Sequence, residues 1–303
     1  VRGDRRSEAG QDGGQAAAQA LIAAKVQVAI GFLCTETLEG ALPRLKDAGI
    51  PVITVSVRSR ILMEDVLKNG WPLFRLAPVD SAEASMAIDT ILKYWASEPM
   101  SLIDDGTIHG RELGGAIRNA LEEKGLKPVF TDTYRPGQDQ QIALVRRLKK
   151  AGATRVFVGG DRSDVAVIAR DAKSENIPLT LMGGDAMRAA DQPVPLLNGV
   201  QAIALPEYAT LPAAQPTAQA MRASGIEPDG YILPAAAAAQ IASQAAESAK
   251  SENKPIADKL VATTFQTAIG PITFGKNHEL TENPYRLLEW RDNAFVPAAG
   301  ASN

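Results

Sequence analysis

Six polar side chains that could do chemistry stand directly after short apolar runs in the middle of the chain. Carboxylates, an imidazole and a guanidinium can transfer protons, and they can also bind a charged small molecule. The residues are Asp104, Asp105, His109, Asp161, Arg162 and Asp185. Paired aspartates that end a strand more often face water or cap the next helix than act as an acid and a base. We therefore favour binding over catalysis for this set.

The motifs that accompany most catalytic chemistry are missing from the sequence. It contains no G-x-S-x-G nucleophile turn, no G-x-x-x-x-G-K-[ST] phosphate loop and no dinucleotide-binding G-x-G-x-x-G. With two histidines and the single cysteine Cys34, an internal disulfide and a cysteine- or histidine-rich metal site are excluded. We expect Cys34 to be a small buried residue. The sequence therefore predicts a protein that is not an enzyme and that carries no cofactor.

The elements that position the six polar residues alternate between strands and helices. MSLIDD, RVFVGG and LTLMGG are short apolar runs that end in Gly or Asp, and each is followed by a helix or turn signal. Such runs predict βαβ units and a parallel sheet. We expect strands at 100–105, 127–132, 154–158, 179–184 and 200–205, and helices at 111–124, 138–151 and 163–174. Ligands of these sheets bind beyond the carboxyl ends of the strands, where the six residues lie.

The first eighty residues predict a second arrangement of this kind. Three further strands are expected, at 26–31, 51–56 and 73–78. A helix precedes them from about Gln15, and the helical segment between the first two is interrupted at Pro43. Asp80 and Glu83 have the spacing of a capping box at the start of the next helix. Near the C-terminus, residues 275–278 predict a turn between two strands.

Length and composition indicate a globular protein of two domains. The chain has 303 residues, of which 45% are hydrophobic and 22% charged. A net charge of −3 gives no basis for binding nucleic acid, and no apolar run approaches the roughly 20 residues of a membrane span. We expect one lobe from residues 1–76 plus 210–283 and another from 77–209 plus 284–303. The chain would cross between them several times, which predicts a hinge that closes around a ligand.

The order and spacing of several segments resemble a known family. These are VQVAIGFLCTETLEGALPRLKDAGIPVITVS, FRLAPVDSAEASMAIDTIL, SLIDDGTIHGRELGGAI, LVRRLKKAGATRVFVGGDRSDVAVIARDA, LTLMGGDA and ENPYRLLEWRDNAF. Together they resemble the type I periplasmic binding proteins, and among these the leucine/isoleucine/valine-binding family of ABC importer receptors. The resemblance covers nearly the whole chain. It implies an α/β fold of two lobes, each a mostly parallel sheet flanked by helices.

Matching to the family implies a set of ligand contacts in the first lobe. Thr35, which follows Cys34 in the same loop, matches a hydroxyl that binds the ligand carboxylate together with backbone N–H groups. The alternative is that Thr35 or Thr37 only caps the helix. Ser56 matches a backbone contact to the ligand. Arg58 replaces a threonine of the family, and it either clamps a carboxylate or turns outward to solvent.

The resemblance also implies contacts in the second lobe. His109 and Asp161 match positions where relatives place tyrosines, and Arg162 adjoins Asp161; His109 could instead cap the following helix. Loss of both aromatic side chains implies a ligand more polar than leucine. Asp185 matches an acidic residue that pairs with the ligand ammonium, or else it is the N-cap of a helical turn. An amino acid held by Thr35 on one lobe and Asp185 on the other would favour the closed state.

Two departures from the family lie near the start of the chain. The family opens with a βα unit and a further strand that have no counterpart here, so either the sequence is trimmed, which we favour, or the first lobe is incomplete. Relatives often pair the cysteine at the Cys34 position with one upstream, which this sequence lacks. Cys34 is therefore expected to be a free thiol, and the thiol itself implies no function. As the neighbour of Thr35 in the same loop, Cys34 is included among the candidate ligand-binding residues.

The sequence as a whole predicts a periplasmic solute-binding protein that delivers an amino acid or related small acid to an ABC permease. An alternative is a ligand-sensing regulatory domain, similar to amide sensors or receptors, because one fold serves several functions. A third interpretation is an enzyme that uses Asp104, Asp105 and His109, but no activated nucleophile or cofactor loop accompanies them. A repressor core shares the two-lobe plan; the given sequence shows no DNA-binding helix-turn-helix before the first lobe, but a trimmed start leaves this interpretation open.

Overall fold

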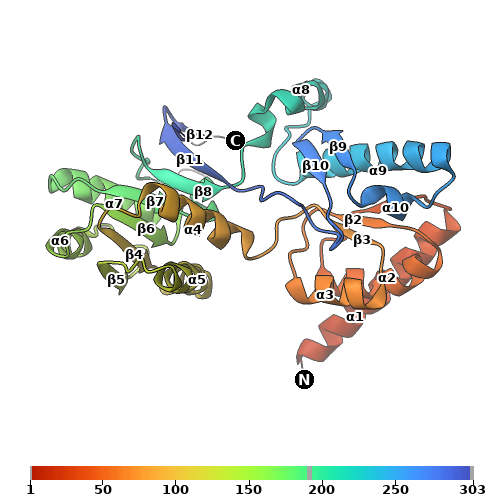
Figure 1. Ribbon diagram of the computed structural model, residues 1–303, viewed down its shortest axis with the longest axis horizontal. Helices are drawn as coiled ribbons and strands as arrows, with labels where there is room; N and C mark the ends of the chain where they lie inside the picture. Colours follow the sequence, from red (N-terminus) through yellow and green to blue (C-terminus); the bar gives the residue numbers. More distant parts are fainter. Residues whose placement is uncertain (1, 190–192, 301–303) are drawn as a thin grey trace. The chain divides into compact units, whose positions relative to one another are not determined.

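The chain folds into two compact units, which Figure 1 shows as a ribbon. The computed structural model describes residues 2–189 and 193–300, with side chains from Gly10 onward. Unit 1 comprises the chain up to Asp80 together with Glu207–Asn283, and unit 2 comprises Ser81–Pro206 together with the chain from Pro284 onward. The boundaries expected after residues 76 and 209 lie within a few residues of these. Among the described helices, none has the length and apolar character needed to cross a membrane.

Unit 1 is built on a parallel sheet of short strands. β1 (Ala29–Ile30), β2 (Val52–Thr54) and β3 (Leu73–Arg75) lie side by side in that order. Val52 pairs with Leu73, and Ile53 pairs with Phe74. Because successive side chains of a strand point to opposite faces, the first pair enters one hydrophobic core and the second pair enters another. The strands are shorter than the apolar runs that predicted them.

Helices cover both faces of this sheet (Figure 1). On the face of Val52 and Leu73 lie α1 (Arg2–Ala23), α2 (Thr35–Asp47) and α3 (Arg60–Asn69). On the face of Ile53 and Phe74 lie α9 (Ile232–Glu252) and α10 (Ile256–Leu260). Most of the side chains that α9 buries are alanines, and this lets the helix approach the sheet closely. Both cores are therefore sealed within unit 1.

Two predictions for the first helices are wrong. α1 begins at Arg2 rather than near Gln15, and α2 runs through Pro43 without interruption. Proline removes one backbone N–H from a helix and usually breaks or kinks it. Here the buried side of α2 is formed by Leu38, Ala41, Leu42 and Leu45. Packing of that apolar side against the core offsets the lost hydrogen bond and keeps the helix continuous.

The second chain segment of unit 1 ends in a β-hairpin and a turn. η2 (Tyr208–Thr210), η3 (Pro212–Ala214) and α8 (Gln215–Ala223) precede α9, and β9 (Thr264–Thr267) pairs with β10 (Gly270–Thr273) after α10. The turn predicted at 275–278 is confirmed, since the amide of His278 donates to the carbonyl oxygen of Gly275 at 2.9 Å. The backbone of Glu279 then forms a parallel β-bridge with that of Arg75. This last segment therefore lies along β3.

Unit 2 contains a seven-stranded sheet within the described residues, in the order β12-β11-β8-β7-β6-β4-β5. The parallel strands are β4 (Met100–Asp104), β5 (Phe130–Thr133), β6 (Arg155–Gly159), β7 (Thr180–Gly183) and β8 (Gln201–Ala204). β11 (Arg286–Arg291) and β12 (Ala294–Pro297) complete it as antiparallel strands. The five strands predicted between residues 100 and 205 are therefore confirmed.

Helices flank the large sheet as well, and they place loops at the carboxyl ends of its parallel strands. They are α4 (Ala82–Tyr94), α5 (Ile108–Glu123), α6 (Ile142–Lys150), α7 (Arg162–Ser174) and the short η1 (Asp185–Arg188). α6 and α7 share a core with Val156 and Val158 of β6, while Phe157 between them is buried outside that core. This alternation confirms the predicted α/β fold with mostly parallel sheets covered by helices.

Candidate functional site

In unit 1, the loop after β1 leads directly into the N-terminus of α2. Gly31 and Phe32 have positive φ angles of 123° and 60°, which turn the chain sharply at the end of the strand. Cys34 is the N-cap residue, and its side chain makes no capping hydrogen bond to the described helix. The N–H groups of the first turn of α2 therefore point out of the helix end without a side-chain cap, as at sites that bind anions.

The structure contradicts the N-cap alternative for Thr35 and the burial that was expected for Cys34. Thr35 is half-buried and is the first residue of α2, so neither it nor Thr37 is the N-cap. Cys34 is exposed and its thiol is free, so the prediction of a free thiol is confirmed and the prediction of a buried one is wrong. The reason is local: β1 ends at Ile30, and the loop that follows has left the sheet before it reaches Cys34.

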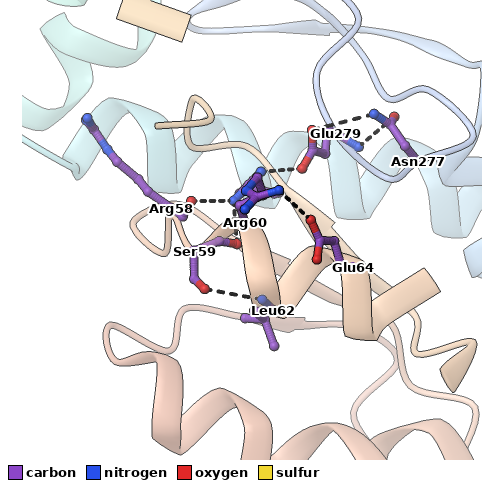
Figure 2. Close-up of polar contacts among 8 residues, drawn as sticks. Arg58, Ser59, Arg60, Leu62, Glu64, Asn277 and Glu279 are labelled. Carbon is purple, nitrogen blue, oxygen red and sulfur yellow. Dashed lines mark hydrogen bonds and ion pairs between the residues drawn. The ribbon is translucent and has the colours of Figure 1, made fainter. Parts of the chain in front are cut away.

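The loop after β2 carries Ser56 and Arg58 and contacts the loop after β1. The Ser56 hydroxyl donates to the Phe32 carbonyl oxygen at 3.4 Å. Ser59 is the N-cap of α3, and its side chain accepts a hydrogen bond from the Leu62 amide at 3.2 Å. Arg58 is half-buried, and Figure 2 shows its side chain extending away from the polar cluster around Glu279. Two predicted residues thus lie in one short loop between β2 and α3.

Arg75, at the end of β3, is a buried residue of this region that sequence reasoning missed. Its side chain is 1% exposed. The guanidinium donates to the carbonyl oxygens of Arg58 at 2.7 Å and Ser59 at 2.9 Å, and it forms an ion pair with Glu279 (Figure 2). Burial lowers the pKa of Arg75, and the charge of Glu279 acts in the opposite direction. A buried cation thereby holds the main chain of the Arg58 loop.

His278 precedes Glu279 in the turn that lies along β3. Its ring stacks on Phe74 at 4.4 Å between centroids, and its Nδ1 donates to the Leu73 carbonyl oxygen at 3.0 Å. Burial lowers the pKa of His278 below its ordinary value of 6.5, against the opposing effect of that hydrogen bond. The neutral ring is therefore the form that the folded chain favours.

This lowered pKa predicts that stability falls as the solution is acidified. Below about pH 6.5 the unfolded chain binds a proton at His278 that the folded chain resists, so free energy of unfolding is lost as pH falls toward the folded-state pKa. We expect His278→Asn to reduce this acid-side slope, because asparagine has no group that titrates in this range. Asparagine also tolerates the positive φ of 62° at this position. Urea unfolding between pH 7.5 and 5 measures it. His109→Asn is the control at the other histidine, and an unchanged slope in His278→Asn would refute the assignment.

In unit 2, the two aspartates at the carboxyl end of β4, Asp104 and Asp105, accept hydrogen bonds from the loop that follows the strand. Asp105 accepts hydrogen bonds from the amide of Thr107 at 2.9 Å and from its hydroxyl at 2.7 Å. Asp104 accepts from the Gly106 amide at 2.9 Å and from the Thr133 hydroxyl at 3.2 Å. Both carboxylates therefore shape the turn before α5. This arrangement agrees with a structural role and gives no support to the acid–base interpretation.

His109 lies in the first turn of α5 with an exposed side chain. The helix begins at Ile108 rather than at 111, and its N-cap is Thr107, whose hydroxyl accepts from the Gly110 amide at 3.1 Å. The alternative in which His109 caps the helix is therefore wrong. Its imidazole is open to solvent at the carboxyl end of β4, where the family match placed a ligand contact.

Asp161 and Arg162 are neighbours in the loop after β6, but they have opposite environments. Asp161 is exposed as the N-cap residue of α7. Arg162 is 5% exposed; it donates to the Met187 carbonyl oxygen at 3.0 Å, and its guanidinium lies 4.3 Å from the centre of the Trp290 ring. A cation over an indole face inside a core is a packing interaction. We therefore remove Arg162 from the candidate ligand contacts and keep Asp161.

Asp185 follows β7 and is held by two hydrogen bonds within unit 2. Its carboxylate accepts from the Leu205 amide at 3.0 Å, and its own amide donates to the Glu83 carboxylate at 2.8 Å. The side chain is half-buried and stands first in η1, whose N-cap is Gly184, so the N-cap alternative for Asp185 is wrong. The Leu205 amide therefore restrains the orientation of the Asp185 carboxylate.

The capping box predicted at Asp80 and Glu83 is wrong, because Glu83 makes a different contact. The N-cap of α4 is Ser81, and Glu83 is a buried residue whose carboxylate reaches Asp185 instead. Gly184 makes this approach possible, because a Cβ there would lie 2.1 Å from the Glu83 Oε1. The spacing of Asp80 and Glu83 in the sequence gave no signal for this contact, which joins α4 to the loop after β7.

Burial raises the pKa values of two side chains beside these loops, Tyr134 and Asp164. Burial raises the pKa of Tyr134, and the charge of Asp164 adds to the effect. Burial also raises the pKa of Asp164, whose carboxylate accepts from the Gly137 amide at 2.8 Å and from the Tyr134 hydroxyl at 3.5 Å. These contacts bind the loop before α6 to the start of α7. Among the described residues, no group of histidine, cysteine and acidic side chains is arranged to hold a metal ion.

The chain is similar in sequence and in fold to known periplasmic binding proteins. The sequence profile of a family described as periplasmic binding protein matches residues 7–294. The leucine-, isoleucine-, valine-, threonine- and alanine-binding protein of Pseudomonas aeruginosa is 23% identical over 279 residues, which cover 89% of this chain and 73% of that protein. An ABC transporter substrate-binding protein from Desulfitobacterium hafniense in complex with Leu superposes with a TM-score of 0.64 at 20% identity and covers 93% of this chain and 84% of its own.

A third similar protein has a ligand of different chemistry. It is a solute-binding protein of an ABC transporter from Rhodopseudomonas palustris, in complex with p-hydroxybenzoic acid. Its TM-score is 0.61 at 15% identity, and the match covers 94% of this chain and 80% of that chain. The fold is therefore shared by proteins whose bound molecules all carry a carboxylate, with or without an amine.

Proposed function

Because the chain belongs to the periplasmic binding protein family, we propose that it binds an amino acid or related small acid outside the cytoplasm and delivers it to an ABC permease. The observation that carries this proposal is the family match over residues 7–294. The positions of the candidate residues agree with it, since they follow the carboxyl ends of parallel strands in both units, where open α/β sheets bind ligands. The proposed function includes no chemical step on the bound molecule.

In unit 1, we assign the ligand carboxylate to the N-terminus of α2. The first-turn N–H groups and the Thr35 hydroxyl offer hydrogen bonds to an anion, and the helix dipole favours negative charge there. The exposed Cys34 contributes its backbone as the N-cap residue. The loop of Ser56 and Arg58 supplies the remaining contacts, with a backbone carbonyl at Ser56 and a guanidinium at Arg58 that suits a second acidic group.

In unit 2, we assign the ligand amine to Asp185. Its carboxylate is half-buried and fixed by the Leu205 amide, so it presents a negative charge without first having to become ordered. His109 and Asp161 are exposed polar residues in neighbouring loops, in place of the aromatic side chains that the family match implied. These substitutions favour a ligand with polar groups over a plain branched aliphatic amino acid.

The charge of Asp185 is predicted to decide between ligands with and without an amine. Asp185→Asn keeps an oxygen that can accept from the Leu205 amide but removes the negative charge. We expect it to weaken binding of an amino acid about tenfold to a hundredfold, the range for a hydrogen bond to a charged group. The same acid without its amine should bind both proteins alike. Calorimetric titration of the two matched ligands measures this difference.

The ligand for that titration comes from a thermal-shift screen of amino acids and small organic acids. A molecule that binds only the folded state raises the apparent unfolding temperature. We expect stabilisation by at least one acid, and the screen should rank polar amino acids above leucine. A complete lack of stabilisation across amino acids, dicarboxylic acids and aromatic acids would contradict the proposed function.

A further inference from the structure

The conformation of the Arg58 loop depends on a side chain from another strand. Residues between β2 and α3 leave the sheet, so their backbone carbonyls have no strand partner. Two successive carbonyl oxygens, those of Arg58 and Ser59, instead accept hydrogen bonds from a single guanidinium nitrogen of Arg75 (Figure 2). Few side chains other than arginine present several donors in a fixed plane. Arg75 is thus suited to fix the direction of this segment of main chain.

Arg75 is in turn held from the opposite side. Its backbone amide donates to the His278 carbonyl oxygen at 2.9 Å, and its side chain forms the ion pair with Glu279. The guanidinium nitrogen Nε is buried without a hydrogen-bond partner among the described residues. Burying a charge with one donor unsatisfied is costly, and an apolar residue of similar volume often gives equal or greater stability. Stability alone therefore does not account for an arginine at this position.

The loop that Arg75 holds carries residues of the proposed solute contact. Ser56 and Arg58 lie in it, and the Ser56 hydroxyl ties it to the loop that begins α2. We propose that Arg75 is a positioning residue, which acts through the Arg58 and Ser59 carbonyls to set the solute-binding conformation of this loop. The inference rests on the proposed function for its consequence in binding, while its effect on the loop can be measured without any solute.

Amide hydrogen exchange tests the effect on the loop. The Val57 amide donates to the Thr54 hydroxyl at 3.4 Å, and the Leu62 amide donates to Ser59 at 3.2 Å, so both report on the loop conformation. In Arg75→Met and Arg75→Lys we expect these amides to exchange about tenfold faster. Methionine has no donor, and the single ammonium nitrogen of lysine cannot replace the two guanidinium nitrogens, one of which reaches the carbonyls and the other Glu279. Lysine keeps the charge beside Glu279 and serves if the methionine variant does not fold.

Two residues labelled in Figure 2, Arg60 and Glu64, provide a matched control. Arg60 and Glu64 form an exposed ion pair on α3 at 2.9 Å. Glu64→Ala removes that pair without touching Arg75, and exposed pairs contribute little. We expect its loop amides and its solute affinity to equal those of the unchanged protein. If the Val57 and Leu62 amides exchange at the unchanged rate in a folded Arg75 variant, the inference is overturned.

Solute affinity gives the second measurement, with L-leucine and L-glutamate as the probes. We expect Arg75→Lys to bind whichever probe the unchanged protein binds about tenfold more weakly, at a temperature where both are fully folded. Faster loop exchange with equal affinity would overturn the positioning role. If neither probe binds the unchanged protein, the proposed function fails for these two amino acids, and the exchange rates alone still decide whether Arg75 holds the loop.

Discussion

Alanine at Gly14 is expected to lower the free energy of unfolding by about 2 kcal/mol, as is typical of overpacking in a tight contact. A Cβ at Gly14 of α1 would lie 2.0 Å from the Thr37 carbonyl oxygen of α2. At the same crossing, a Cβ at Gly40 would lie 2.2 Å from the Gln11 carbonyl oxygen. Both obstacles are backbone atoms, so relief requires the two helices to separate. Separation would expose the core that holds Ala18, Leu38 and Leu42.

The neighbouring glycine supplies the control. Gly13 is exposed in the same helix, and a Cβ there would meet no atom within 4 Å. Gly13→Ala should therefore stabilise the protein by up to about 1 kcal/mol, through helix propensity alone. Guanidinium unfolding of both variants measures the contrast between adjacent positions that sequence alone treats as equivalent. Equal stability of Gly13→Ala and Gly14→Ala would show that the two helices do not cross as described.

Features of the fold that depend on local pattern could be predicted from the sequence. In unit 2, β4, β6 and β7 are short apolar runs with Gly or Asp at their ends, and all five parallel strands were placed correctly to within a few residues. The turn at 275–278 has its own glycine signal. Continuity of α2 through Pro43 was not predictable in this way, because it depends on how well Leu38, Leu42 and Leu45 pack against other elements.

Burial of single residues in loops could not be predicted, because local sequence does not say which side chain turns inward. Asp161 and Arg162 are adjacent and both polar, yet Arg162 enters the core because Trp290 and Phe295 of distant strands offer it aromatic faces. Cys34 was expected to be buried, because cysteine is among the residue types most often buried in proteins. It is exposed because the turn at Gly31 and Phe32 lifts its loop out of the sheet.

The roles of Glu83 and Arg75, which hold the candidate loops, were also not predicted, because each contacts a residue far away in the sequence. Glu83 and Asp185 are 102 residues apart, and Arg75 and Glu279 are 204 residues apart. Pairing at such separation is set by the strand order of each unit. A charged residue inside an apolar strand, as Arg75 is within LFRLAP, was the one available signal, since a buried charge requires a partner.

Glu83 gives the second large prediction, because it fixes the backbone of the residue that we assign to the ligand amine. Glu83→Ala would leave the Asp185 amide without its acceptor and would open a cavity where the buried carboxylate lies against Gly184. We expect a loss of about 2–3 kcal/mol in the free energy of unfolding, the cost of leaving a buried donor unsatisfied and losing the packing around it. Amino acid affinity should fall about tenfold as Asp185 loses its fixed position.

Glu83→Gln separates the hydrogen bond from the charge. The glutamine oxygen can accept from the Asp185 amide in the same place, so we expect most of the stability and affinity to return. Asp89→Ala is the control on the same helix, where the side chain is exposed and its removal should change neither quantity. Urea unfolding and calorimetric titration with the amino acid from the thermal-shift screen measure the series. If Glu83→Ala binds that amino acid as tightly as Asp89→Ala does, then Asp185 is not positioned by Glu83, and its role would have to rest on the Leu205 contact alone.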